Sequence, residues 1–123
     1  MKIIIFIGNH PRHFFFANQI INNYPVEGVI IENREKNVPK PGSNISTIDK
    51  NNFIKHFKNR EFYENKYFKE NNLNENQYVL KVDNIQKNKQ KVLIYLNKIK
   101  PDLVFLFGVS VIKNEVLNAM PKN

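Results

Sequence analysis

Two short apolar runs, each stopped by a glycine, constrain the fold of this 123-residue chain more than any other feature. The chain opens with MKIIIFI before Gly8, and near its other end LVFLF runs into Gly108. Both runs are continuous rather than alternating, which is typical of strands buried on both faces of a parallel sheet. A turn and a helical pattern follow each glycine. The sequence therefore predicts an α/β sheet with a pocket at its strand ends.

The rest of the chain repeats the same alternation of strand and helix. Strands are predicted over residues 2–7, 26–32, 78–82 and 103–107, and helices over residues 12–24, 53–69, 87–100 and 110–120. This order predicts a Rossmann-like open parallel sheet with strand order 3-2-1-4 and helices on both faces. Residues 33–52, rich in Asn, Pro, Gly and Ser, predict a mobile loop. The first and fourth strands would be neighbours, so the turns after Gly8 and Gly108 would flank one crevice.

Composition narrows the class of protein. The length fits one domain, and the absence of cysteine excludes disulfides and thiolate chemistry. No apolar run approaches the roughly 20 residues of a membrane helix, so we expect a cytoplasmic protein with no membrane contact. The net charge is +8, but only Arg12, Arg34 and Arg60 among the 19 basic residues are arginines. Since phosphate-reading surfaces favour arginine, this charge indicates nucleic-acid binding only weakly.

The turn GNHPRH, residues 8–13, is the first candidate site. It leads into a helix N-terminus, where free backbone N–H groups attract anions, and Asn9, Arg12 and His13 could add side-chain contacts. The alternative is an ordinary strand-to-helix turn with exposed polar residues. The turn lacks the glycines of a GxGxxG dinucleotide fingerprint and the lysine of a P-loop.

The segment FGVSVI, residues 107–112, is the second candidate. It carries backbone groups and apolar side chains that can cradle a flat ring, although a packed strand-to-helix junction would look the same. A third pattern places His56, Arg60, Tyr63 and Tyr67 along one helical stripe, which predicts either contact with an anionic substrate or a solvated face.

The sequence shows no catalytic apparatus of its own. Its three histidines lack metal-ligand spacing, so no metal site is expected. No Ser–His–Asp arrangement and no paired carboxylates are evident, so no catalytic residue is assigned.

The C-terminal stretch IKPDLVFLFGVSVIKNEVLNAMP, together with the opening MKIIIFIG, resembles the folate-dependent formyltransferases. That family includes methionyl-tRNA formyltransferase, glycinamide ribonucleotide formyltransferase and sugar N-formyltransferases. The stretches NHPRHFFFANQI and HFKNREFYENKYF also resemble a bacterial subgroup linked to surface-polysaccharide genes. The resemblance covers essentially the whole chain and implies formyl transfer from 10-formyltetrahydrofolate to an amine, with an amino sugar on a nucleotide carrier as the expected acceptor.

The resemblance also implies site residues. Phe107, Gly108, Val109 and Ile112 would bind the pterin of 10-formyltetrahydrofolate through backbone contacts. Asn9, Arg12 and His13 would face the acceptor.

The family's catalytic Asn-x-His motif follows the "MP", and a catalytic Asp lies further on. Residues 1–123 are therefore expected to be the N-terminal part of one formyltransferase-type domain. This part is expected to lack the next strand of the sheet and to be inactive alone. The full-length protein could form a homodimer. Two alternatives stay open. One is methionyl-tRNA formyltransferase, with tRNA as partner, although the first loop lacks that enzyme's GTPxFA type of sequence. The other is a non-catalytic nucleotide- or ligand-binding α/β module.

Overall fold

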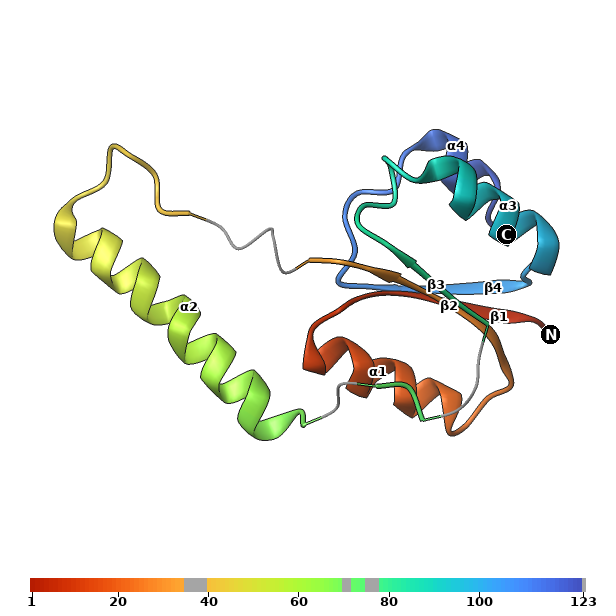
Figure 1. Ribbon diagram of the computed structural model, residues 1–123, viewed down its shortest axis with the longest axis horizontal. Coiled ribbons are helices and arrows are strands. Elements are labelled where there is room, and N and C mark those ends of the chain that lie inside the picture. Colours follow the sequence, from red (N-terminus) through yellow and green to blue (C-terminus); the bar gives the residue numbers. More distant parts are fainter. Residues whose placement is uncertain (35–39, 70–71, 75–77, 123) are drawn as a thin grey trace.

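A four-stranded parallel sheet forms the centre of the computed structural model, which describes residues 1–34, 40–69, 72–74 and 78–122 (Figure 1). The strands are β1 (Ile3–Gly8), β2 (Val26–Glu32), β3 (Tyr78–Val82) and β4 (Leu103–Phe107). Their spatial order is β3-β2-β1-β4, which confirms the predicted topology. In register, Gly8 lies opposite Glu32 and Ile7 lies opposite Phe107, so the carboxyl ends of three strands share one edge.

Helices cover both faces of this sheet, as predicted (Figure 1). Helix α1 (Pro11–Ile21) covers one face, while α3 (Lys89–Ile99) and α4 (Asn114–Asn118) cover the other. Strand β1 supplies both cores, because its successive side chains point to opposite faces. Ile5 and Ile7 pack with α1, and Ile4 and Phe6 pack with α3. Burying each such side chain contributes about 1.5–3 kcal/mol, so β1 is the main anchor of the fold.

Strand β4 is one of the two edges of the described sheet, and β3 is the other. Strand β4 pairs with β1, and its side chains are at most half-buried. Leu106 and Phe107 are exposed hydrophobic residues. Unpaired edges of this kind are prone to pairing with another strand.

The second helix differs from its prediction. Helix α2 (Thr47–Tyr67) begins at Thr47 rather than residue 53, because the side chain of Ser46 accepts a hydrogen bond of 3.1 Å from the backbone N–H of Asp49. The hydroxyl of Ser46 also donates to the Asp49 carboxylate at 2.7 Å, which completes an N-terminal cap. The expected loop over residues 33–52 is therefore shorter, since 47–52 are helical. Residues 35–39 of that loop lie outside the described residues.

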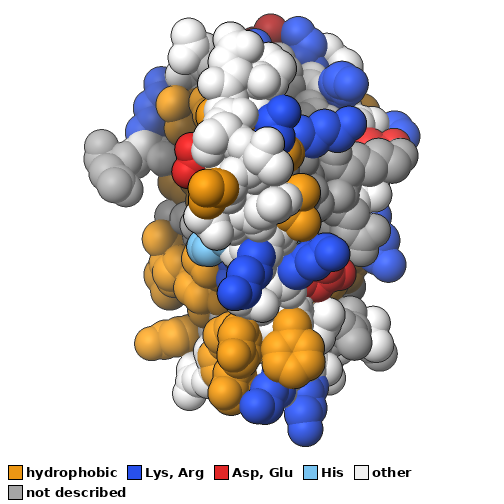
Figure 2. All heavy atoms as spheres, turned by 90° about the vertical axis from the view of Figure 1, so that its left-hand side faces the viewer, with side chains coloured by type: hydrophobic (Ala, Val, Ile, Leu, Met, Phe, Trp, Pro, Cys, Tyr) orange, Lys and Arg blue, Asp and Glu red, His pale blue; other side chains and the backbone are white. Residues whose placement is uncertain are grey.

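Helix α2 stands away from the sheet, and none of its residues is buried (Figure 1). The ion pair of Arg12 with Glu64 and the ring contact of Phe15 with Phe68, the residue that ends α2, join this end of the helix to α1. Figure 2 shows the face that carries α2, where hydrophobic and basic side chains lie side by side. Among the described helices, none combines the length and apolar character needed to cross a membrane.

The last helix is much shorter than predicted. A helix was expected over residues 110–120, with Ser110 as its cap, but α4 spans Asn114–Asn118 and its N-cap is Lys113. The expectation was wrong because the Ser110 hydroxyl donates to the Glu32 carboxylate at 2.7 Å instead of capping a helix. Residues 109–113 consequently have no regular secondary structure.

Candidate functional site

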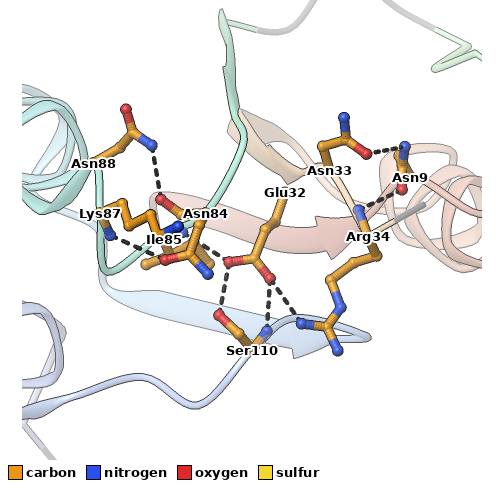
Figure 3. Close-up of polar contacts among 9 residues, drawn as sticks. All are labelled: Asn9, Glu32, Asn33, Arg34, Asn84, Ile85, Lys87, Asn88 and Ser110. Atoms are coloured by element: carbon orange, nitrogen blue, oxygen red, sulfur yellow. Dashed lines mark hydrogen bonds and ion pairs between the residues drawn. The ribbon is translucent and has the colours of Figure 1, made fainter. Parts of the chain in front are cut away.

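The carboxylate of Glu32 organises the carboxyl edge of the sheet (Figure 3). Glu32 is the last residue of β2 and is 0% exposed. It accepts hydrogen bonds from the Ile85 N–H at 2.7 Å, the Ser110 N–H at 2.8 Å and the Ser110 hydroxyl at 2.7 Å. Hydrogen bonds to an ionised acceptor are roughly twice as strong as neutral ones. One side chain therefore joins β2, the turn before α3 and the segment after β4.

This link passes over the end of β1, which lies between β2 and β4 in the sheet. Gly8 ends β1 opposite Glu32 and has no side chain to block the passage. A Cβ at Gly8 would lie 2.7 Å from the Gly108 carbonyl oxygen, which is too close for a real contact. The two glycines that end the apolar runs are thus needed where the backbone after β4 meets the end of β1.

Asn9 fixes the chain where it leaves β2 (Figure 3). Its Oδ1 accepts a hydrogen bond from the Arg34 N–H at 2.8 Å, and its Nδ2 donates to Asn33 Oδ1 at 3.1 Å. The Arg34 guanidinium lies 3.5 Å from Glu32 Oε1. Asn9, predicted to face an acceptor, lies at the strand ends as expected, but its amide is already used in this network.

His13 is buried at the crevice between β1 and β4. It is 1% exposed and its ring meets Phe107 edge-on at 5.1 Å between centroids. Burial, and next the charges of Arg12 and His10, lower the pKa of His13 to about 4, and a hydrogen bond with the Gly8 backbone opposes this shift. Among the described residues, none offers a hydrogen-bond partner to its Nε2. His13 is therefore buried as a neutral ring beside Phe107.

Gly108 makes room for this ring. Its φ of +72° is in the left-handed region, and a Cβ there would lie 2.2 Å from His13 Nε2. The family resemblance assigns Gly108 to the pterin site through backbone contacts. In the structure the neighbour that requires the glycine is His13.

Arg12 points to α2. Its guanidinium forms an ion pair with Glu64, which also accepts from Arg60 Nε at 2.9 Å. Burial, and next the charge of Arg60, lower the pKa of Arg12. Tyr63 and Tyr67 of the predicted polar stripe stack on each other and are exposed. Arg12 thus contacts α2 through Glu64.

The segment over residues 107–112 has side chains both on the core and at the surface. Val109 and Ile112 pack against the core under α3 and α4, whereas Val111 is 82% exposed. Within the described parts of the chain, no hydrogen bond involves the backbone of Val109, Val111 or Ile112. The backbone groups of these three residues are thus not used in hydrogen bonds to the described residues. The exposed Val111 was not among the predicted site residues.

A hollow of about 620 Å³ opens beside Asn9 at the ends of β2 and β3. Its size lies in the range of small-molecule sites. The apolar residues Phe14 and Leu73 line it together with two basic residues, Lys81 and Lys91, and one acidic residue, Asp83. This combination can accept a molecule that carries both an apolar part and a negative charge. Over the described ranges, no cluster of His, Cys, Asp and Glu could hold a metal ion.

Comparison of the chain with protein-family models, with curated proteins and with solved structures finds no match.

Proposed function

We propose that this chain forms the donor-binding part of a formyltransferase-type domain, with residues 107–112 as the seat for the pterin of 10-formyltetrahydrofolate. The observation that carries the proposal is the anchoring of this segment at Ser110, while the backbone groups of Val109, Val111 and Ile112 make no hydrogen bond with the described residues. Val111 and the half-exposed Phe107 add apolar surface beside those groups. A flat heteroaromatic ring needs this combination of backbone donors and acceptors with apolar contact.

The acceptor would occupy the hollow at the ends of β2 and β3. We propose an amino sugar on a nucleotide carrier, since Lys81 and Lys91 would attract its phosphates and Phe14 and Leu73 would contact its base. The bound donor supplies the formyl group. The residues of this chain bind and orient the two molecules, and a cytoplasmic setting fits a chain without cysteine.

The position of Glu32 argues against dinucleotide binding. In Rossmann folds an acidic residue at the end of the second strand binds the ribose hydroxyls of the cofactor. Here both carboxylate oxygens already accept hydrogen bonds from Ile85 and Ser110. The first turn also lacks the required glycines. This weighs against a dinucleotide-binding module as the alternative function.

Calorimetric titration with 5-formyltetrahydrofolate, a stable folate with the same pterin ring system, tests the donor site. We expect saturable binding that Val111→Asp weakens at least tenfold, because a carboxylate would lie against the ring. Ile48→Asp is the matched control, since Ile48 is also strongly exposed but lies on α2. Binding that both variants leave unchanged, or no binding at millimolar folate, would contradict the proposal.

A second titration tests the acceptor class. Uridine and thymidine diphosphates should bind, and Lys81→Ala with Lys91→Ala should weaken them, while Lys58→Ala on α2 should not. Tight binding of tRNA without binding of nucleoside diphosphates would favour the methionyl-tRNA formyltransferase alternative.

A further inference from the structure

Glu32 is the one fully buried acidic side chain among the described residues. Burying a carboxylate is costly unless hydrogen bonds and charges compensate for the lost water. An apolar residue of similar size often stabilises a core better than a buried charge does. Stability alone therefore gives a poor account of a carboxylate at this position.

The geometry of its contacts indicates what the charge is used for. Oε2 accepts from the Ile85 N–H and the Ser110 hydroxyl, and Oε1 accepts from the Ser110 N–H (Figure 3). Ser110 thus gives the carboxylate both of its donors, one to each oxygen. A residue held in this way has neither its backbone nor its side chain free to rotate.

Ser110 lies between the residues that pack inward and the residue that points outward. Val109 and Ile112 contact the core, and Val111 is exposed to solvent. If Ser110 were released, residues 109–112 would be held by apolar contact alone, because the described residues give no hydrogen bond to the backbone of Val109, Val111 or Ile112. The α-helical continuation that the sequence favours from Ser110 would then compete with the observed conformation.

We infer that Glu32 is a positioning residue: its carboxylate fixes Ser110 and thereby keeps residues 109–113 non-helical, with the backbone around Val111 open to a ligand. The identity of that ligand rests on the proposed function. The fixing of the segment does not.

The inference requires that the side chain at position 32 accepts hydrogen bonds through two atoms. A carboxylate has two accepting oxygens, whereas an amide has only one. In Glu32→Gln one oxygen becomes an NH₂ group, which must face the N–H of Ser110 or the donors from Ile85 and Ser110. This substitution keeps the size of the side chain and removes part of the set of hydrogen bonds that joins residue 32 to Ile85 and Ser110. Ser110→Ala removes the hydroxyl and keeps the N–H contact, so its effect should be smaller.

Backbone ¹⁵N relaxation of the chain, with and without 5-formyltetrahydrofolate, tests the inference. In the unsubstituted chain we expect order parameters near those of rigid backbone, about 0.85, for residues 109–112, and in Glu32→Gln values below about 0.6. The order parameters of β1 and α3 should not change. The folate affinity should fall at least tenfold in Glu32→Gln and by a smaller factor in Ser110→Ala.

Glu27→Gln is the matched control, because it makes the same chemical change at an exposed position of β2. Residues 109–112 that stay rigid in Glu32→Gln would overturn the inference. If Glu32→Gln does not fold, the test is made with Ser110→Ala. Unchanged order parameters for residues 109–112 in that variant would overturn the inference. Lower order parameters confined to these residues would support it. Loosening in a chain that binds no folate would leave the positioning role intact and would refute the proposed function.

Discussion

Strand β1 and helix α2 show how differently two parts of one small chain are held. All six residues of β1 are buried, whereas none of the 21 residues of α2 is. The continuous apolar run of β1 supplies side chains to both faces of the sheet. In α2 the apolar residues are scattered around the helix, so no single face collects them for burial. Packing of a short strand therefore decides stability here, and helix length does not.

The largest expected effect compares one substitution in the two regions. Ile5→Ala in β1 should lower the free energy of unfolding by about 2–5 kcal/mol, because Ile5 is 0% exposed and its loss leaves a cavity. Ile54→Ala in α2 should change it by less than about 0.5 kcal/mol, since Ile54 is 44% exposed. Urea unfolding followed by circular dichroism measures both. Equal losses would show that α2 is part of the cooperative core.

A second substitution tests the junction of β1 with the segment after β4. Gly108→Val should destabilise the fold by about 3 kcal/mol, because the left-handed φ of +72° disfavours a branched side chain and His13 occupies the space. Gly42→Val is the control, since the nearest atom to its added Cβ is 3.9 Å away. A stable Gly108→Val variant that loses folate binding alone would restore the sequence-based explanation of this glycine.

The buried His13 makes the stability of the β1 end depend on pH. Its pKa is about 4 when folded against an ordinary value of 6.5, so the unfolded chain takes up a proton that the native chain does not. The contribution of His13 to the free energy of unfolding should therefore be complete above pH 6.5. The free energy of unfolding should fall by up to about 3 kcal/mol as the pH drops to 4. Unfolding curves at pH 7, 5.5 and 4.5 measure this loss, and His13→Gln should flatten it. An unchanged pH dependence in His13→Gln would assign the loss to other groups.

The sequence predicted the strands more reliably than it predicted the candidate site. The bounds of β2, β3 and β4 and the strand order follow from local apolar runs, and the structure confirms them. The contact of Ser110 with Glu32 joins residues 78 positions apart, so no local pattern shows it. The burial of His13 likewise depends on Gly8 and Gly108, which meet only in the folded chain. The one local signal was the charge of Glu32 at the end of the apolar run VIIE.

The smallest expected effect lies where the two compared regions meet. Arg12 and Glu64 are 27% and 11% exposed, so their ion pair is screened only in part, and we expect a coupling free energy of about 1 kcal/mol. Unfolding of Arg12→Ala, Glu64→Ala and the double variant gives this coupling as a double-mutant cycle. Arg60→Ala serves as the control, because Arg60 contacts the same carboxylate from within α2. If Arg12→Ala left stability unchanged but weakened binding of nucleoside diphosphates, Arg12 would be a ligand group, as the sequence predicted. If Arg12→Ala lowered stability and left the binding of nucleoside diphosphates unchanged, Arg12 would be the link that holds the weakly packed helix to the well-packed sheet.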